Sequence, residues 1–362
     1  EYAIGTVMLN IERDTSFLLV VGSGCLTDLT RYISSRTGIP FISVPTAASM
    51  DGYASSGAPM LHGGYKRTII STHPQAIIAD VDVLCQAPYE MTASGFSDTL
   101  GKLNSRVDWK LSNIVIGEYY CPYFVEVIDQ VVNMCVDNIE GIAQRDPAIM
   151  ARLMEGLIFS GIGMLVIGNS RPASGSEHSL SHYWEMKALF ENRPQHFHGT
   201  KVGVGTGVMA KFCEKFFARN PSDVDLADVQ ARKRPLADLE HDLRRCLGPV
   251  GEEIIREVTR TQYLEWEAQK QQIEKLQGSW EEILALQAIE PTFERVFTIQ
   301  RAAGASILPK EIHVGRDLLR EAILHAKEVR SRYTVLRAAE TLDWLEEITE
   351  EVVNEYPAEE AQ

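Results

Sequence analysis

The sequence predicts an α/β domain followed by an all-α domain. Short apolar runs alternate with a helical stretch near the start of the chain, and a glycine turn follows the first run. Strand signals nearly vanish beyond residue 88. A chain of 362 residues is long enough for two domains with a core each. We place the α/β domain at residues 1–88 and the all-helical domain at residues 89–362.

The first strands follow from short apolar runs. Residues 17–21, "FLLVV", end in "GSG", and the next stretch, "CLTDLTRYISSRTG", has helical spacing up to Gly38. Residues 41–45, "FISVP", form a second buried run. Because strand, helix and strand follow one another, we expect a parallel sheet with a crossover helix. Two further short strands are expected at "KRTII" and "AIIAD".

Long helical stretches dominate the remainder of the chain. They include "PYEMTASGFSDTLGKLNSRVDWKLSN", "YFVEVIDQVVNMCVDNIEGIA" and "AIMARLMEGLIFSGIGMLVIG". The most apolar part, "LIFSGIGMLVIG", is interrupted by glycines and shorter than the roughly 20 residues of a membrane span, so we expect a buried helix and no membrane insertion. The acidic tail after Tyr333 is expected to form a solvated helix.

Charge and cysteine content narrow the class of protein. The formal net charge of -15 argues against nucleic acid or an acidic membrane surface as the main partner. It does not exclude a small anionic ligand, because a local cationic pocket can lie on an acidic protein. The six cysteines are scattered and include no CxxC pair, which is typical of reduced thiols in a cytoplasmic protein.

A glycine turn lies between the first strand and the first helix. In "VVGSGCLTD", Gly22 and Gly24 allow a tight turn, and the helix N-terminus can then meet a phosphate. The turn lacks the full GxGxxG spacing of a Rossmann fingerprint and an acidic residue at the end of the next strand. Taken alone it is therefore a weak indication of a nucleotide, because many strand-to-helix turns need glycine for geometry only.

The loop after the second strand is a stronger indication. "VPTAASMDGYASSGAP" is long and rich in small residues, and ligands of open parallel sheets bind at the carboxyl ends of strands. A connection of this length without structure of its own is uncommon unless it is functional. Its polar side chains are Thr46, Ser49, Asp51, Ser55 and Ser56.

Four of the nine histidines fall within one short window. His178 and His182 have the i, i+4 spacing of two metal ligands on one helix face. His196 and His198 follow, and "ASGFSDTLGK" offers Asp98 as an acidic partner on a helix. Histidines more often pack or form hydrogen bonds than bind metals, so the residue types leave a metal site and a structural role both open.

Several of these motifs together resemble one family. "VGSGCLTDLTRY", "VPTAASMDGYASSGAP", "GFSDTLGK", "SRPASGSEHSLSHYWE" and "HGTKVGVG" occur in the order found in sn-glycerol-1-phosphate dehydrogenases. These enzymes belong to the iron-containing alcohol dehydrogenase and dehydroquinate synthase-like superfamily. The resemblance runs from about residue 17 to residue 209, and more loosely through "LREAILHAKEVRSRYTVL". The chain looks closest to the bacterial branch.

The resemblance implies a catalytic centre that differs from the one that spacing suggests. Asp98, His178 and His198 would be the ligands of one divalent metal, for which zinc fits best and nickel or iron are alternatives. His182 would then face the substrate or support a ligand, and His196 would have no role in the site.

The resemblance also implies NAD or NADP as the cofactor, bound by a Rossmann-like domain. Its pyrophosphate would lie against Gly22, Ser23, Gly24 and Asp28, and its nicotinamide end against Thr46, Ser49, Asp51 and Ser55. In this family the first strands of the nucleotide domain precede the glycine turn, so we expect this domain to be truncated at its N-terminus. The residue that discriminates NAD from NADP lies in those strands, and the sequence does not choose between the two cofactors.

The activity that this resemblance implies is the reversible reduction of dihydroxyacetone phosphate to sn-glycerol 1-phosphate. Lys102 and Arg171 are the cations nearest the motifs and would bind the phosphate, while Asp98 would also contact the substrate. The alternatives are a glycerol dehydrogenase, a dehydroquinate synthase-like lyase acting on a sugar phosphate, and a non-catalytic relative. We expect a homo-oligomer, namely a dimer, that acts in the cytoplasm on a small phosphorylated substrate.

Overall fold

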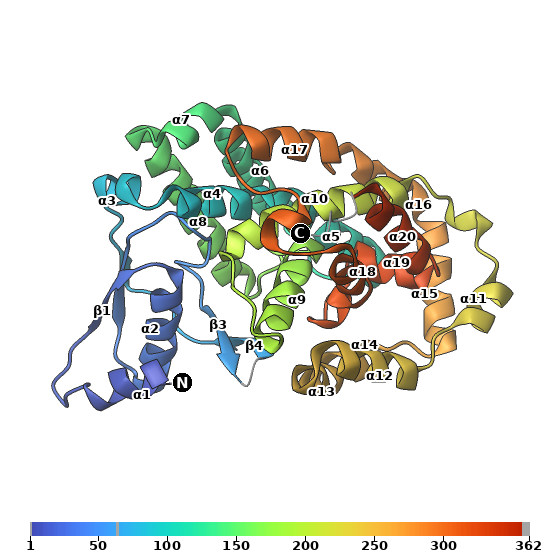
Figure 1. The fold of residues 1–362 in the computed structure, drawn as a ribbon, viewed down its shortest axis with the longest axis horizontal. Helices are drawn as coiled ribbons and strands as arrows, with labels where there is room; N and C mark the ends of the chain where they lie inside the picture. Colours follow the sequence, from blue (N-terminus) through green and yellow to red (C-terminus); the bar gives the residue numbers. More distant parts are fainter. Residues whose placement is uncertain (1, 63–64, 357–362) are drawn as a thin grey trace.

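The computed structural model describes residues 2–62 and 65–356; of His62 it describes the backbone only. A small α/β region, drawn in blue in Figure 1, lies at one end, and helices make up the rest. The predicted fold class, α/β followed by all-α, is confirmed. The predicted boundary at residue 88 stays a prediction, although the last described strand ends before it.

The α/β region is built on a short parallel sheet. Its strand order is β1-β2-β5, with β1 at Leu18–Gly22, β2 at Phe41–Pro45 and β5 at Ala76–Ile77. Helix α2, Gly24–Thr37, forms the predicted crossover between β1 and β2 and ends at Gly38, which has a φ of 74°. Helix α1, Tyr2–Leu9, precedes the sheet and has no buried residue.

A β-hairpin follows the loop after β2, and the sequence indicated only its second strand. Strands β3, Gly57–His62, and β4, Tyr65–Ile70, pair antiparallel. The first residues of β3, 57–59, were expected to belong to the long loop of small residues, and they pair with β4 instead. The hairpin reaches the helical region, since Lys66 of β4 forms an ion pair of 2.7 Å with Glu185.

Every described element after β5 is a helix. Those of the first half of this region are α3 Val81–Gln86, α4 Tyr89–Leu100, α5 Lys102–Ile116, α6 Pro122–Asp137, α7 Ile139–Gln144, α8 Pro147–Ile167, α9 Ser176–Phe190 and α10 His198–Phe217. Those of the second half are η1 Pro221–Asp223, α11 Leu226–Arg232, α12 Leu236–Leu247, α13 Pro249–Ile254, η2 Ile255–Thr259, α14 Arg260–Gln262, α15 Trp266–Gly278, α16 Trp280–Leu284, η3 Ala285–Ala288, α17 Phe293–Ala302, η4 Pro309–Ile312, α18 Arg316–His325, η5 Ala326–Glu328, α19 Val335–Thr341 and α20 Leu345–Glu355.

Helix α10 lies at the centre and contacts both α4 and α9. Its glycines allow this close approach: a Cβ at Gly199 would lie 1.9 Å from the carbonyl oxygen of Ser94 in α4. A Cβ at Gly205 would lie 2.6 Å from the carbonyl oxygen of Glu177 in α9. The glycine-rich start of α10 therefore brings three helices together at one point, and this point is where the site lies.

Helix α8 matches the predicted long helical stretch, but it is only partly buried where a buried helix was expected. It has 21 residues and is long and apolar enough to cross a membrane by length and composition, but a single helix of this kind is weak evidence for a span. In its most apolar stretch, 44% of the residues are buried inside the protein. Leu153 and Leu157 lie on the buried face, while Phe159 and Val166 are exposed.

The C-terminal helix is not solvated as the sequence analysis expected. In α20 the residues Leu345, Ile348, Val352 and Val353 are buried and belong to the large core of the helical region. Their spacing places them on one face of the helix, and the glutamates lie between them. The expectation was wrong because the acidic composition concealed this apolar stripe.

Candidate active site

Three side chains from three helices converge where α4, α9 and α10 meet. Asp98, His178 and His198 each offer one ligand atom, and these atoms all lie within 4.8 Å of one another. The Oδ1 atom of Asp98 lies 3.3 Å from Nε2 of His178 and 3.9 Å from Nε2 of His198. Asp98 and His178 are buried, and His198 is partly exposed. These are the residues that the family resemblance implies as metal ligands.

The hydrogen bonds around this cluster fit a divalent cation. Oδ1 of Asp98 is buried and has no hydrogen-bond partner in the described part of the chain. Nδ1 of His178 lies 2.7 Å from Oε1 of Glu177, so the imidazole donates its proton there and turns the lone pair of Nε2 toward Asp98. A carboxylate and two imidazole nitrogens suit zinc, nickel or iron and leave coordination positions for a substrate.

The pKa values of Asp98 and His198 favour protonation states that bind metals. Burial raises the pKa of Asp98, but His178 and His198 beside it outweigh this effect and hold that pKa well below its usual range. Burial lowers the pKa of His198 to about 3, against the opposing effect of Asp98. Asp98 is therefore an anion and His198 a neutral imidazole near neutral pH, as metal ligation requires. Burial lowers the pKa of His178, but Asp98 and Glu177 outweigh this and raise it, so a metal would displace a proton there.

His182 lies beside the cluster but is not part of it. Its ring centroid is 6.3 Å from that of His178 and 5.8 Å from that of His198. Its Nε2 lies 3.4 Å from a guanidinium nitrogen of Arg330, and its Nδ1 is buried without a partner in the described structure. Because a guanidinium can only donate, Nε2 accepts and the proton of a neutral ring is on Nδ1. This arrangement favours a substrate-facing role over the i, i+4 ligand pair.

His196 lies apart from these residues. Its Nε2 is 2.9 Å from Nδ1 of His313, and this contact is exposed to solvent. The two rings are stacked with centroids 5.1 Å apart. The expectation that His196 has no role in the site stays a prediction.

The glycine turn and the loop after β2 lie side by side at the carboxyl end of the sheet. The backbone N–H of Thr46 donates to the carbonyl of Gly22 over 3.2 Å. Gly22 has a φ of 157°, which favours glycine, and a Cβ at Gly24 would lie 2.4 Å from Cε of Met50. Ser23 makes no side-chain capping bond at the start of α2, and of the first three N–H groups that of Leu26 bonds the Ser23 carbonyl, which leaves those of Gly24 and Cys25 for an anion.

A buried arginine that the sequence analysis did not single out holds the loop in place. The guanidinium of Arg31 donates to Ser55 Oγ over 3.2 Å and to the carbonyl of Tyr53 over 2.9 Å, and it also bonds the carbonyls of Gly52 and Gly57. It forms an ion pair of 2.8 Å with Asp28, whose pKa burial raises to about 7. Asp28 and Ser55, both predicted to contact the cofactor, are therefore bound to Arg31. Nothing in the residue pattern distinguishes this arginine from an exposed one.

The same loop contacts the Asp98–His178–His198 cluster through Asp51. Its backbone N–H donates to Oδ2 of Asp98 over 3.0 Å. Its carboxylate accepts from Nζ of Lys102 over 2.9 Å and from Oγ of Ser160 over 2.8 Å. Ser49, from the same loop, accepts through its carbonyl from Ser94 of α4 over 3.0 Å. The site therefore lies where the α/β region meets the helical region.

Both cations that the sequence analysis expected to bind phosphate are engaged within the chain. Lys102 is 1% exposed and is ion-paired with Asp51. Arg171 is 2% exposed and forms an ion pair of 2.6 Å with Glu118. The Arg171 guanidinium also donates to the carbonyl of Tyr333 over 2.9 Å. Their roles as substrate ligands remain predictions, and the structure shows structural partners for each.

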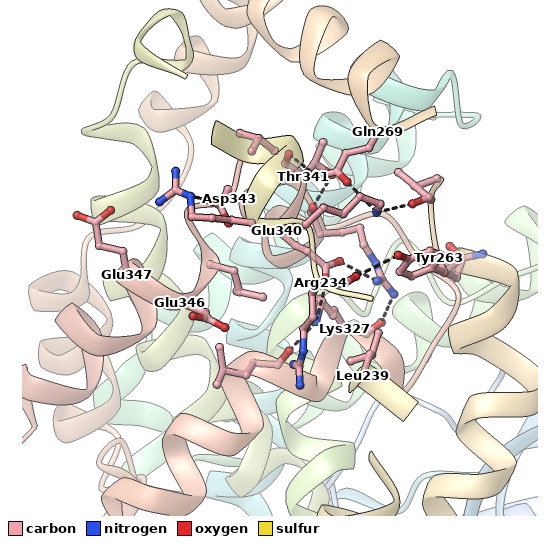
Figure 2. Close-up of a pocket in the computed structure, with 18 residues that line it drawn as sticks. Arg234, Leu239, Tyr263, Gln269, Lys327, Glu340, Thr341, Asp343, Glu346 and Glu347 are labelled. Carbon is pink, nitrogen blue, oxygen red and sulfur yellow. Dashed lines mark hydrogen bonds and ion pairs between the residues drawn. The ribbon is translucent and has the colours of Figure 1, made fainter. Parts of the chain in front are cut away.

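A cavity lined by charged side chains lies elsewhere in the helical region. Figure 2 shows this cavity of about 660 Å³, which is lined by charged side chains from the segments around α11, α15, α19 and α20. Its cations are largely neutralised: Arg337 pairs with Glu340 over 2.9 Å, and Arg232 pairs with Asp343 over 3.0 Å. None of the cluster residues lines it, so the candidate active site is not this cavity.

Comparison with known proteins places the chain in a family. The family model described as iron-containing alcohol dehydrogenase matches residues 3–88. The chain is 35% identical to the glycerol-1-phosphate dehydrogenase [NAD(P)+] of Bacillus licheniformis, over 93% of this chain and 71% of the relative. It is 32% identical to the Bacillus subtilis protein of the same name, over 91% of this chain and 71% of the relative. The chain belongs to the glycerol-1-phosphate dehydrogenase family.

The resemblance drawn from the motifs, including the bacterial branch, is confirmed by these relatives. Among solved structures, the glycerol dehydrogenase of Schizosaccharomyces pombe superposes with a TM-score of 0.59 at 15% identity. This match covers 98% of this chain and 75% of that chain. At this level of identity the match shows a shared fold.

Proposed function

We propose that this chain catalyses the reversible, metal-dependent reduction of dihydroxyacetone phosphate to sn-glycerol 1-phosphate with NADH or NADPH. One observation carries the proposal: the Asp98–His178–His198 cluster lies directly against Asp51 of the loop after β2. A hydride can pass between cofactor and substrate only where a cofactor loop and a substrate-polarising centre meet. The glycerol-1-phosphate dehydrogenases to which the chain is related carry NAD(P)+ in their name.

Asp98, His178 and His198 would hold one divalent ion, with zinc favoured and nickel or iron as alternatives. When bound, the ion supplies positive charge that polarises the substrate carbonyl. The chain itself orients the ligands, because Glu177 fixes the His178 ring and the Asp51 N–H fixes the Asp98 carboxylate.

His182 is proposed to act on the substrate oxygen. Its Nδ1–H is buried, free of protein partners in the described residues and adjacent to the cluster. A donor in this position can form a hydrogen bond to the oxygen on which charge develops as hydride arrives. The burial of Asp98, His178 and His182 limits the access of water to the reacting atoms.

The cofactor would lie along the carboxyl end of the sheet. In this proposal the N-terminus of α2, with Gly22, Ser23 and Gly24, binds the pyrophosphate. The loop after β2 lines the nicotinamide end through Thr46, Ser49 and Asp51. Asp28 and Ser55 would act through Arg31, which holds the loop. A dimeric assembly and a cytoplasmic location complete the proposal.

Glycerol dehydrogenase activity is the second candidate. The ion pairs of Lys102 and Arg171 favour it, because neither predicted cation is free for a phosphate. A lyase of the dehydroquinate synthase type is less favoured, because that class prefers glutamate where this chain has Asp98.

Substrate-dependent oxidation of NADH and NADPH tests the proposal. The metal-loaded enzyme is expected to consume reduced cofactor stoichiometrically with dihydroxyacetone phosphate and far more slowly with dihydroxyacetone. Equal turnover of the two substrates would support a glycerol dehydrogenase instead. No net consumption with either substrate, for each of zinc, nickel and iron, would overturn the proposal.

A further inference from the structure

We infer that Arg330, assisted by Arg332, binds the substrate phosphate, in place of the Arg171 and Lys102 that the sequence suggested. This inference rests on the proposed function and names the residue that gives it specificity for a phosphorylated substrate. Both arginines lie in the loop between η5 and α19, facing the loop between α8 and α9.

Arg330 has no carboxylate bound to it in the described part of the chain. Its guanidinium donates to Oγ of Ser174 over 3.1 Å and, more weakly, to Oγ of Ser170 over 3.4 Å, and its other contact is Nε2 of His182. Glu177 is the acidic group that acts on it from a distance, and Oε1 of Glu177 is already engaged with His178. Burial lowers the pKa of Arg330 to about 10, so it stays charged at neutral pH.

Arg332 brings a second positive charge to the same place. It donates to the carbonyl of Ser174 and to Oγ of Ser170, and no carboxylate of the described structure pairs with it. Burial and the charges of Arg330 and Arg171 lower its pKa. Two guanidinium groups that share two serines without a counter-ion are costly to bury, and a bound dianion would offset that cost.

The other cations around the site are neutralised to a greater extent. Lys66 and Lys201 both bind Oε2 of Glu185, at 2.7 and 2.9 Å. Lys102 and Arg171 each have a carboxylate partner. Arg330 and Arg332 are therefore the cations around the site that have no carboxylate partner in the described part of the chain, whereas each of these lysines and Arg171 has one.

The position of Arg330 suits a phosphate held close to a reacting carbonyl. In dihydroxyacetone phosphate the phosphorus is joined to the carbonyl carbon through one carbon and one oxygen atom. His182 lies beside both the Asp98–His178–His198 cluster and Arg330: its ring is 5.8 Å from that of His198, and its Nε2 is 3.4 Å from the Arg330 guanidinium. A substrate whose carbonyl lies at the cluster can therefore extend its phosphate past His182 to Arg330. Arginine is suited to this role because its planar guanidinium binds phosphate oxygens bidentately.

Kinetics with two substrates test this inference. In Arg330→Ala, kcat/KM for dihydroxyacetone phosphate is expected to fall by about 10- to 100-fold more than kcat/KM for dihydroxyacetone. Arg330→Lys keeps the charge and is expected to lose less. Arg320→Ala removes one exposed arginine elsewhere and serves as the matched charge control. An equal loss with both substrates would mean that Arg330 only positions His182, and would overturn the inference.

A binding measurement gives a readout besides activity. Calorimetry of the metal-loaded enzyme with inorganic phosphate is expected to show at least roughly tenfold weaker binding for Arg330→Ala and for Arg332→Ala, while Arg320→Ala binds as the unmodified chain does. Unchanged phosphate affinity in both variants would overturn the inference.

Failure of this inference and failure of the proposed function give different experimental results. If the unmodified enzyme prefers dihydroxyacetone phosphate and Arg330→Ala keeps that preference, the proposed function stands and this inference is wrong. If the unmodified enzyme neither prefers that substrate nor binds phosphate, the proposed function itself is wrong.

Discussion

The backbone N–H of Asp51 donates a hydrogen bond to Oδ2 of Asp98 over 3.0 Å. This bond joins a loop of the α/β region to a carboxylate of the helical region, 47 residues further along the chain. It leaves Oδ1 of Asp98 directed at His178 and His198. The orientation of a candidate metal ligand is therefore set by the loop that we expect to line the cofactor.

We predict that one divalent ion binds per chain and that chelation abolishes turnover. His178→Ala and His198→Ala should each lose both the ion and the activity, because two protein ligands bind a divalent ion much more weakly than three. His182→Ala should keep the ion and lose rate. Metal content by mass spectrometry checks this, and loss of the ion from His182→Ala alone would contradict the ligand assignment.

Removal of the Asp51 carboxylate should destabilise the protein. Asp51→Asn leaves the backbone bond to Asp98 but deprives buried Lys102 of its counter-charge, which typically costs about 3–5 kcal/mol. Urea unfolding measures the loss. The double variant with Lys102→Met should recover part of it, because no unpaired charge then remains buried. A double variant that is as unstable as the sum of both single variants would refute this explanation.

Glu185 should make stability depend on pH. Burial raises the pKa of Glu185, but Lys66 and Lys201 outweigh this and hold it well below its usual range. A lowered pKa in the folded state means that the carboxylate stabilises the fold above its unfolded pKa of about 4.5. This contribution is lost progressively as the pH falls from there through the folded pKa. The free energy of unfolding of Glu185→Gln, measured from pH 3 to pH 7, should therefore depend less on pH than that of the unmodified chain. Parallel curves would contradict the assignment.

The glycine at the start of α10 should be required for the metal site. In Gly199→Ala the added Cβ would lie 1.9 Å from the carbonyl oxygen of Ser94, so α10 must move away from α4 and carry His198 with it. Metal affinity should fall, as isothermal titration can measure. Gly278→Ala is the matched control, because a Cβ there meets nothing within 4 Å in helix α15. Unchanged metal affinity in Gly199→Ala would show that the close approach is not needed.

The residue pattern predicted those helices and strands that are determined by their own residues. The apolar runs of β1 and β2 and the helical spacing of α2 were sufficient, because each element is determined by its own residues and by the glycine that ends it. The hairpin strand β3 was missed, and α20 was interpreted as solvated. Both depend on partners distant in the sequence: β3 pairs with β4, and α20 packs into the core of the helical region.

For the candidate site, the sequence indicated the residues but not how they come together. The motifs marked Asp98, His178 and His198 through their resemblance to a family, while spacing alone pointed to His178 and His182. Their convergence could not be derived from the sequence, because it depends on how closely glycines of α10 let three helices approach.

The sequence by itself determined the fold class, the family and which residue types could hold a metal and a nucleotide. Only the tertiary structure decided which charges are available to a ligand. Arg171 and Arg330 are both arginines close to the motifs, but Glu118 neutralises Arg171 and no carboxylate of the described residues pairs with Arg330. The physical reason is that a charge is available or neutralised according to its neighbours in space, and those neighbours lie far away along the chain.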